Sequence, residues 1–171
     1  MKKSENSEIT DGNSCKNTEN ISGIDLTRKL LESALDTNRK SYEYDQDDDW
    51  FHGQYHEFDN LFVIWQITPG FNGFRVKSYT VGNSVDDAKQ QEALTFCKGR
   101  NVSYISSEAY IDDVSEELVL ETELDFDDEV SEDFIRRRLS DLFDSHIEFF
   151  EEALEWGLIE NNLRVSDLQE Q

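Results

Sequence analysis

Cysteine and long apolar runs are scarce in this chain of 171 residues. Its two cysteines, Cys15 and Cys97, do not show the paired spacing that zinc sites and redox couples use. Sparse cysteine fits a reducing compartment, and we expect a cytoplasmic location. The sequence has no run of about 18 apolar residues, so it predicts no membrane-spanning helix. Residues 4–20 also lack the apolar run of a signal peptide or membrane anchor.

Basic residues are scarce as well. The 16 Lys and Arg are outnumbered by 39 Asp and Glu, which gives a formal net charge of −23 and a pI near 4.2. A field of that sign opposes direct binding to nucleic-acid phosphate and docking on anionic lipid. We therefore expect no nucleic-acid or membrane binding, and a protein partner with a basic or polar surface.

Enough apolar material remains for a folded core. Hydrophobic residues make up 36% of the chain and aromatic residues 12%, which argues against global disorder despite 32% charged residues. The length suits one domain. Composition divides the chain into a flexible polar leader (residues 1–22), a single α+β domain (residues 23–158) and a polar tail (residues 159–171).

The longest regular pattern is a predicted helix from Ser131 to Leu158. Ser131 is a suitable N-cap, and Glu132 and Asp133 place negative charge in the first turn, where the helix dipole favours it. Apolar residues recur three or four positions apart on one broad side, which indicates a helix that faces the core. These residues are Phe134, Ile135, Leu139, Leu142, Phe143, Ile147, Phe150, Leu154 and Leu158.

The remaining segments alternate between helical and strand periodicity. We predict a first helix over residues 22–38 and a second from Ser84 to Gly99. Strands are predicted over residues 50–58, 61–67, 74–81, 103–111 and 117–126, with connections short enough for antiparallel pairing. The order α-β-β-β-α-β-β-α predicts an α+β fold in which helices cover an antiparallel sheet of about five strands.

Two clusters imitate metal sites. His52 and His56 stand four apart, but the surrounding residues favour a strand, where that separation spans roughly 13 Å, too far for one ion. Asp45, Asp47 and Asp49 imitate the start of a calcium loop, which then fails because it lacks the required glycine and the bidentate glutamate. We therefore expect no metal and no cofactor.

Recognisable nucleophile–base–acid orders and glycine-rich phosphate loops are also missing, so we do not expect an enzyme. Between Glu108 and Ile135 the chain has thirteen acidic residues and no Lys or Arg. Such a run is either a solvated face or a docking surface for a basic partner.

Four segments resemble the YbjN-like family of small bacterial proteins, which shares the fold of type III secretion chaperones. They are the acidic turn of residues 45–50, the Ala93–Asn101 segment, the acidic hairpin that leads into Leu118-Val119-Leu120, and the helix start at residues 131–133. The resemblance covers about residues 24–158. It implies an α+β sandwich that is commonly dimeric and acts by binding other proteins.

These observations favour a non-enzymatic protein-binding module, chaperone-like or adaptor and regulatory in kind. The alternative is an acidic decoy or immunity-type inhibitor that mimics DNA or neutralises a basic toxin. For the module we predict a partner-binding face on the acidic hairpin, where aromatic rings anchor and carboxylates steer. Its residues are Tyr104, Tyr110, Glu117, Glu121, Glu123 and Asp125. A homodimer is predicted through the surplus apolar residues Phe62, Ile64, Phe149 and Trp156.

Overall fold

A computed structural model describes residues 23–160 except residues 39, 59–60, 104–105 and 127–129. The predicted leader, residues 1–22, therefore lies outside the described residues, as does most of the predicted tail. The helices are α1 (Gly23–Thr37), α2 (Gln90–Ser103) and α3 (Glu132–Glu155), and a 3-10 turn, η1 (Asp87–Lys89), precedes α2. The strands are β1 (Tyr42–Asp45), β2 (Trp50–Gln54), β3 (Val63–Pro69), β4 (Gly73–Ser84), β5 (Ser107–Ile111) and β6 (Glu117–Asp125).

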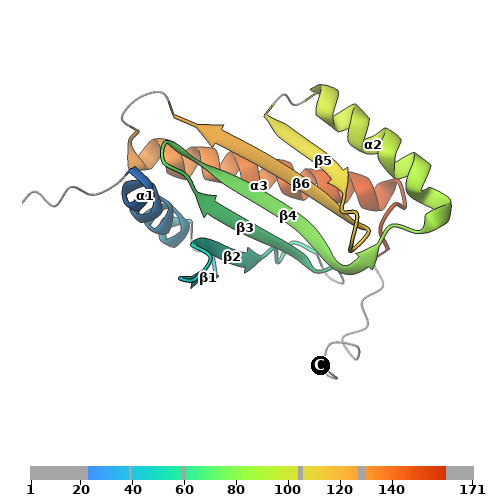
Figure 1. The fold of residues 1–171 in the computed structure, drawn as a ribbon, viewed down its shortest axis with the longest axis horizontal. Coiled ribbons are helices and arrows are strands. Elements are labelled where there is room, and N and C mark those ends of the chain that lie inside the picture. Colours follow the sequence, from blue (N-terminus) through green and yellow to red (C-terminus); the bar gives the residue numbers. More distant parts are fainter. Residues whose placement is uncertain (1–22, 39, 59–60, 104–105, 127–129, 161–171) are drawn as a thin grey trace, which may run out of the picture.

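The strands form one antiparallel sheet in the order β1-β2-β3-β4-β6-β5 (Figure 1). The α+β class and the element order are confirmed, but the sheet has six strands rather than about five. The additional strand is β1, which forms a hairpin with β2 around the acidic turn of residues 46–49. This strand alternates tyrosine with acid over only four residues, which is too short a pattern to be distinguished from the acidic turn that follows.

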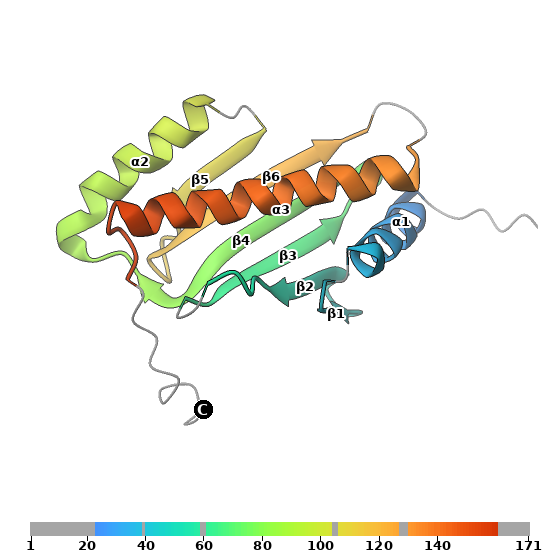
Figure 2. The ribbon, with the colours of Figure 1, turned by 180° about the vertical axis from the view of Figure 1, so that it is seen from behind.

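Helix α3 runs along one face of the sheet, as seen from behind in Figure 2. Ser131 caps it as predicted, because its side chain accepts a hydrogen bond from the Phe134 N–H at 3.2 Å. The buried stripe faces the sheet, and Trp65 of β3 lies 5.1 Å from Phe143, ring centre to ring centre. The stripe consists of Ile135, Leu139, Phe143, His146, Phe149, Phe150 and Ala153.

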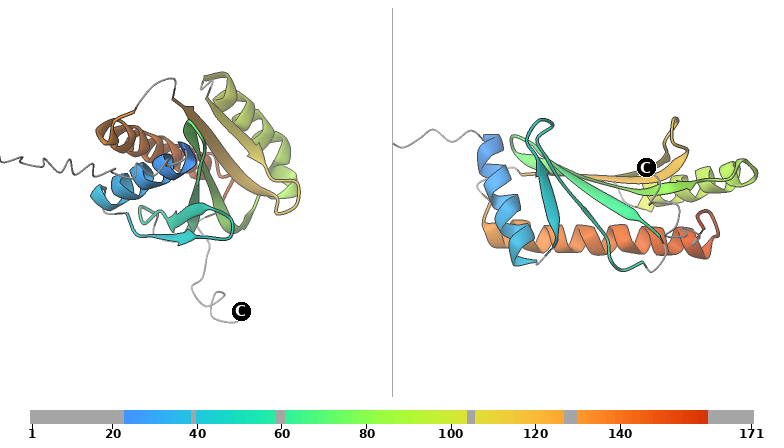
Figure 3. Two further views of the ribbon diagram at one scale, coloured as in Figure 1. Left: turned by 60° about the vertical axis from the view of Figure 1, so that its left-hand side comes forward. Right: turned by 90° about the horizontal axis from the view of Figure 1, so that it is seen from below.

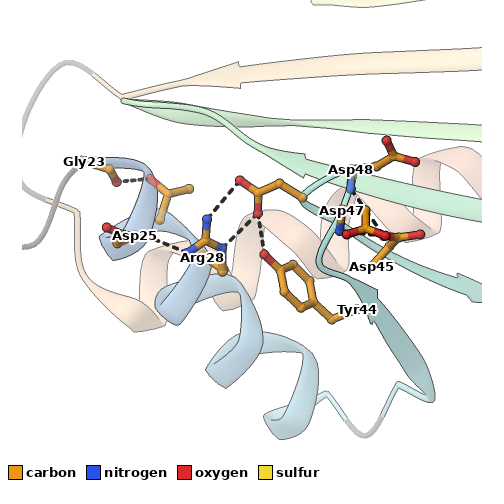
Figure 4. A network of polar contacts seen from close by, with 9 residues as sticks. Gly23, Asp25, Arg28, Tyr44, Asp45, Asp47 and Asp48 are labelled. Atoms are coloured by element: carbon orange, nitrogen blue, oxygen red, sulfur yellow. Dashed lines mark hydrogen bonds and ion pairs between the residues drawn. The ribbon is translucent and has the colours of Figure 1, made fainter.

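Helix α1 crosses the end of this layer and holds the β1–β2 hairpin (Figure 4). Arg28 donates from Nε and Nη2 to the two carboxylate oxygens of Asp49, each at 2.9 Å, and from Nη1 to Asp25 at 2.7 Å. The Tyr44 hydroxyl donates to the same Asp49 carboxylate at 2.6 Å. The Arg28 guanidinium holds the pKa of Asp49 below its usual value. Asp49, one of the three acids that imitate a calcium loop, therefore has a structural role, because it anchors the β1–β2 hairpin to α1.

Helix α2 lies along β5 and differs from the prediction at both ends. It was expected to begin at Ser84, but Ser84 is the last residue of β4 and pairs with Glu117, and Asp86 instead caps the 3-10 turn that precedes the helix. Gly99 was expected to end the helix, but it lies inside it on the exposed side. The sequence around Gly99 continues into helix because Asn101 bonds to β5, a contact that local propensity does not encode.

Gly99 provides a direct test of this assignment. A Cβ atom built at Gly99 meets no other atom within 4 Å. Gly99→Ala is expected to raise the free energy of unfolding by about 0.5–1 kcal/mol, because alanine loses less backbone entropy on forming a helix. Urea denaturation measures this change, and a clear loss of stability would show that the helix does not continue through this position.

The predicted boundary of the tail is also too early. Leu158 and Ile159 are both 2% exposed, and the Glu160 N–H donates to the Asn83 side-chain oxygen at 3.2 Å. The folded part therefore includes Ile159. The described helices include none that is both long and apolar enough to cross a membrane.

Candidate functional site

The second face of the sheet is not covered by any described helix, as the right-hand view of Figure 3 shows. Contacts of the sheet with α3 show which side chains lie on this second face. Ser78 and Thr122 both bond to His146 of α3, so their neighbours in sequence on β4 and β6 point the other way. We call this uncovered side the open face. Its central residues are Ile64 and Gln66 on β3, Arg75, Lys77 and Tyr79 on β4, Val119, Glu121 and Glu123 on β6, and Glu108 and Tyr110 on β5.

An apolar row crosses the open face. Strand register places Ile64 opposite Tyr79, Tyr79 opposite Val119, and Val119 opposite Tyr110. Val119 is only 1% exposed although no described helix covers it. The two tyrosines on its flanks therefore supply the cover, and Ile64, Tyr79 and Tyr110 remain partly exposed. Aromatic side chains grouped in this way are typical of the centre of a protein-binding surface.

A charged row runs beside the apolar row and differs from the bare acidic stripe that was predicted. Arg75 of β4 lies between two of the acids, with its Nε atom 3.1 Å from Glu121 and its Nη2 atom 3.6 Å from Glu123. Lys77 stands opposite Glu121 in register. The predicted stripe of acids is therefore partly neutralised by basic residues of the neighbouring strand, which the sequence separates from it by about 45 residues.

The structure brings Tyr110 and Glu121 together as predicted. The Tyr110 hydroxyl donates to the Glu121 carboxylate at 3.3 Å. Burial and this carboxylate raise the pKa of Tyr110 to about 12. Glu121 is thus held by two partners, whereas Glu123 and Asp125 are exposed. Among the described residues, the Glu123 carboxylate has only the 3.6 Å contact with Arg75, so Glu123 and Asp125 are the acids that can steer a partner with the least loss of internal contacts.

The two remaining residues of the predicted partner-binding face are Glu117 and Tyr104. Glu117 accepts a hydrogen bond from the Gly82 N–H at 2.8 Å, so its carboxylate supports the irregular part of β4 between Tyr79 and Ser84. Tyr104 lies outside the described residues.

The four residues of the predicted dimer interface do not form one surface. Phe149 is 0% exposed and its ring lies 5.2 Å from that of Phe96, so α2 of the same chain covers it. Trp156 is 51% exposed but belongs to the end of α3, on the covered side of the sheet. Phe62 and Ile64 alternate with buried core residues and are half-buried on the other side. The prediction counted Phe149 as surplus apolar surface beyond what one sheet face can cover, whereas helix α2 covers it through Phe96.

The two imitated metal sites have other roles. His52 and His56 line one shallow hollow of about 300 Å³ beside β1, where the Nε2 atom of His52 lies 3.4 Å from a Glu43 carboxylate oxygen. Asp45 accepts from the backbone N–H groups of Asp47 and Asp48, which shapes the hairpin turn. Within the described ranges, no group of three or more His, Cys, Asp or Glu side chains has an arrangement that could hold a metal ion.

Absence of metal binding stays a prediction. Calorimetric titration of the full chain with zinc and then with calcium is expected to give no stoichiometric heat, because neither the His pair nor the Asp run has the geometry of a metal ligand set. A site of micromolar affinity or better for either ion would contradict this expectation.

Sequence reasoning missed a chain of polar groups inside the core. His146 of α3 is 0% exposed, with Nδ1 2.7 Å from the Ser78 hydroxyl and Nε2 3.0 Å from the Thr122 hydroxyl. The chain continues from Ser78 to the Tyr55 hydroxyl at 3.2 Å and from Thr122 to the Ser107 hydroxyl at 2.8 Å. Burial lowers the pKa of His146 to about 3, and the charge of Arg100 acts in the same direction. The imidazole is therefore neutral, with one nitrogen donating and the other accepting.

A signal for this row of buried polar side chains is present in the sequence. His146 follows Leu139 and Phe143 at helical spacing, and Ser78 and Thr122 occupy inward positions in their strands. Although Ser78 and His146 stand at the distance of a nucleophile and its base, both are 0% exposed. No substrate reaches them in this structure, so the pair serves to fix α3 in register on the sheet.

One sheet face covered by helices and one that no described helix covers make the described part of this chain a two-layer α+β fold. The chain belongs to the YbjN family, whose model, described as "Putative bacterial sensory transduction regulator", matches residues 27–156. The fold is similar to that in the structure described as "Crystal structure of YbjN, a putative transcription regulator from E. coli". That similarity has a TM-score of 0.62 at 16% sequence identity, and it covers 77% of this chain and 94% of that chain. No curated protein matches the chain. The predicted family is thereby confirmed.

Proposed function

We propose that this chain is a regulatory or adaptor protein that acts by binding another protein through the open face. The observation that carries the proposal is the apolar row Ile64–Tyr79–Val119–Tyr110, which lies on the side of the sheet that no described helix covers. The family description, which refers to sensory transduction regulators, supports a regulatory role.

Charge around the row indicates the kind of partner. Glu123 and Asp125 are exposed at one side of the apolar row, and the formal net charge of the whole chain is −23. A basic or polar partner would be steered towards these carboxylates and anchored on the aromatic rings. Binding should therefore weaken with salt but keep a salt-resistant part. We propose that this partner is a protein met in the cytoplasm, and that nucleic acid and membrane are not bound directly.

A non-enzymatic mode of action agrees with the described residues. The close Ser–His pair is buried, and the partly exposed Glu121 of the open face has Arg75 and Tyr110 as partners. The alternative of an acidic decoy is not supported by the comparisons. Arg75 and Lys77 also interrupt the acids, whereas a mimic of duplex DNA needs regularly spaced negative charge.

Affinity purification of the tagged full chain from its native host, followed by quantitative mass spectrometry, tests the proposal. The double variant Ile64→Thr/Tyr79→Thr keeps strand-forming residues and replaces two of the four residues of the apolar row. It is expected to lose most of the partner recovered by the wild type. Leu94→Gln is the matched control, because Leu94 is 42% exposed on α2, away from the open face. Equal recovery of the same partner by the wild type and the double variant would overturn the proposal.

Self-association through the open face is a separate prediction. Phe62 and Ile64 are half-buried in the single chain, and a second copy would cover them. Light scattering at micromolar concentration is expected to give a homodimer for the wild type and a monomer for Ile64→Lys. Trp156→Gln should remain dimeric, because Trp156 lies on the other side of the sheet. A monomeric wild type would contradict the prediction.

A further inference from the structure

The sheet has two edge strands, β5 and β1, and their outward-facing backbone groups differ in whether they have hydrogen-bond partners. At β5, the Asn101 side chain of α2 donates to the Ala109 carbonyl at 3.0 Å and accepts from the Ala109 N–H at 2.6 Å. The amide thereby takes the hydrogen bonds that a neighbouring strand would make. The β5 edge is closed at its centre.

Strand β1 lies at the opposite edge, and its backbone direction follows from the register. The Tyr55 N–H donates to the Val63 carbonyl at 3.0 Å, so the backbone groups of Tyr55 point towards β3. Backbone direction alternates along a strand, and His52, three residues earlier, therefore points towards β1. Its opposite residue is Glu43, which consequently bonds inward to β2.

Tyr42 and Tyr44 flank Glu43, so their backbone N–H and C=O groups point outward from the sheet. Among the described residues, no hydrogen bond to these outward groups is found. Unpaired groups on an edge strand are a template for another strand. Figure 2 shows β1 at the margin of the sheet, with no described element beyond it.

The two sides of β1 have different chemistry. Glu43 and Asp45 point to the side of the open face, and the Glu43 side chain is 85% exposed. Tyr42 and Tyr44 point to the other side, where both rings contact Phe51. The hollow lined by Glu43, His52, His56 and Ile64 lies beside the acidic side and has room for a long side chain.

An added strand of matching chemistry would alternate basic and β-branched residues. Its basic residues would face Glu43 and Asp45, and its β-branched residues would lie against the two tyrosine rings, a favourable cross-strand pairing. A second copy of β1 fits poorly, because antiparallel pairing would bring the acids of both copies together.

We propose that the β1 edge binds an extended, basic peptide segment of another protein, which joins the sheet as a seventh strand. The inference rests on the proposed function and names the kind of segment that the partner presents. Backbone hydrogen bonds to Tyr42 and Tyr44 provide affinity, and the alternating charge of the segment sets which face it turns towards Glu43.

The test uses the full chain and a fluorescein-labelled octapeptide of alternating lysine and valine, followed by fluorescence anisotropy. In the proposed register the valine N–H groups point at β1 and the lysine N–H groups point away. N-methylation of the valines is therefore expected to lower affinity at least about tenfold, the cost of lost hydrogen bonds. N-methylation of the lysines should leave the affinity nearly unchanged. Both N-methylated peptides carry the same charge, so a difference in affinity between them reports on the backbone hydrogen bonds.

Two further measurements complete the test. Hydrogen exchange by NMR should show new protection at the Tyr42 and Tyr44 amides when the octapeptide is added. Glu43→Gln should weaken binding about threefold, and the matched control Glu148→Gln on the exposed side of α3 should not. Equal affinity for the two N-methylated peptides, or no gain in protection, would overturn the inference. Tyr79 does not line the hollow, so recovery of the partner by the single variant Tyr79→Thr would still decide the proposed function independently.

Discussion

Acidification from about pH 7 to about pH 4 is expected to remove roughly 3 kcal/mol of stability through His146 alone. The imidazole is neutral in the fold, where burial lowers its pKa to about 3, and it ordinarily titrates near 6.5 when unfolded. Between these two values the unfolded chain binds a proton that the folded chain does not. The contribution of His146 to the free energy of unfolding is therefore fully present above about pH 6.5. It falls by about 1.4 kcal/mol for each pH unit below that value, until the pKa of the folded state is reached.

Such a loss is a large fraction of the roughly 5–15 kcal/mol that stabilises a typical domain. Its cause is geometric, because a protonated imidazole has two donors and no acceptor, and it would be enclosed between α3 and the sheet. The Arg100 guanidinium of α2 adds positive charge nearby and acts in the same direction. The hydroxyls of Ser78 and Thr122 carry no charge that could offset it.

Carboxylates also contribute to acid unfolding, and the experiment must separate them from His146. Asp49, Asp112 and Asp133 have lowered pKa values in the fold, so they too lose stabilising contacts as the pH falls. His146→Gln is the useful variant, because its amide both donates and accepts but does not titrate. Urea unfolding at a series of pH values should show the wild type losing its advantage over His146→Gln below about pH 6.5. Parallel pH profiles for the two proteins would contradict a buried neutral histidine.

Sequence patterns predicted the elements that repeat a clear period. Helix α3 has a capping serine and apolar residues at helical spacing, and its observed bounds lie close to the predicted ones. The alternation of Arg75, Lys77 and Tyr79 with Phe74 and Val76 in the predicted strand of residues 74–81 likewise matches the two faces of β4. These features are local, so neighbouring residues contain the necessary information.

Features that depend on distant residues were not predicted. Strand β1 exists because Asp49 in the turn meets Arg28 of α1, and α2 passes Gly99 because Asn101 bonds to β5. The charge of the acidic hairpin was misjudged for the same reason, since Arg75 reaches it only through strand pairing. Register between strands, rather than composition, decides which charges become partners.

The second large effect is expected at Gly53 on β2. A Cβ atom at this position would lie 2.3 Å from Cζ2 of the Trp65 indole and 2.6 Å from the Ser41 carbonyl oxygen. Trp65 is 0% exposed and its ring is fixed against Phe143, so neither neighbour moves easily. Gly53→Ala is therefore expected to lower the free energy of unfolding by about 2–3 kcal/mol, the upper part of the usual range for overpacking a core.

A double-mutant cycle shows whether the indole causes this loss. Trp65→Phe removes the atom nearest to the added methyl, so Gly53→Ala should cost markedly less in the Trp65→Phe background than in the wild type. Gly99→Ala is the matched control, because the same added methyl meets nothing there and is expected to stabilise. Strict additivity of the two substitutions, measured by urea unfolding, would contradict the close approach of Gly53 to Trp65. A coupling above about 1 kcal/mol would show that the β1–β2 hairpin is seated directly on the Trp65 ring, which positions the β1 edge beside the open face.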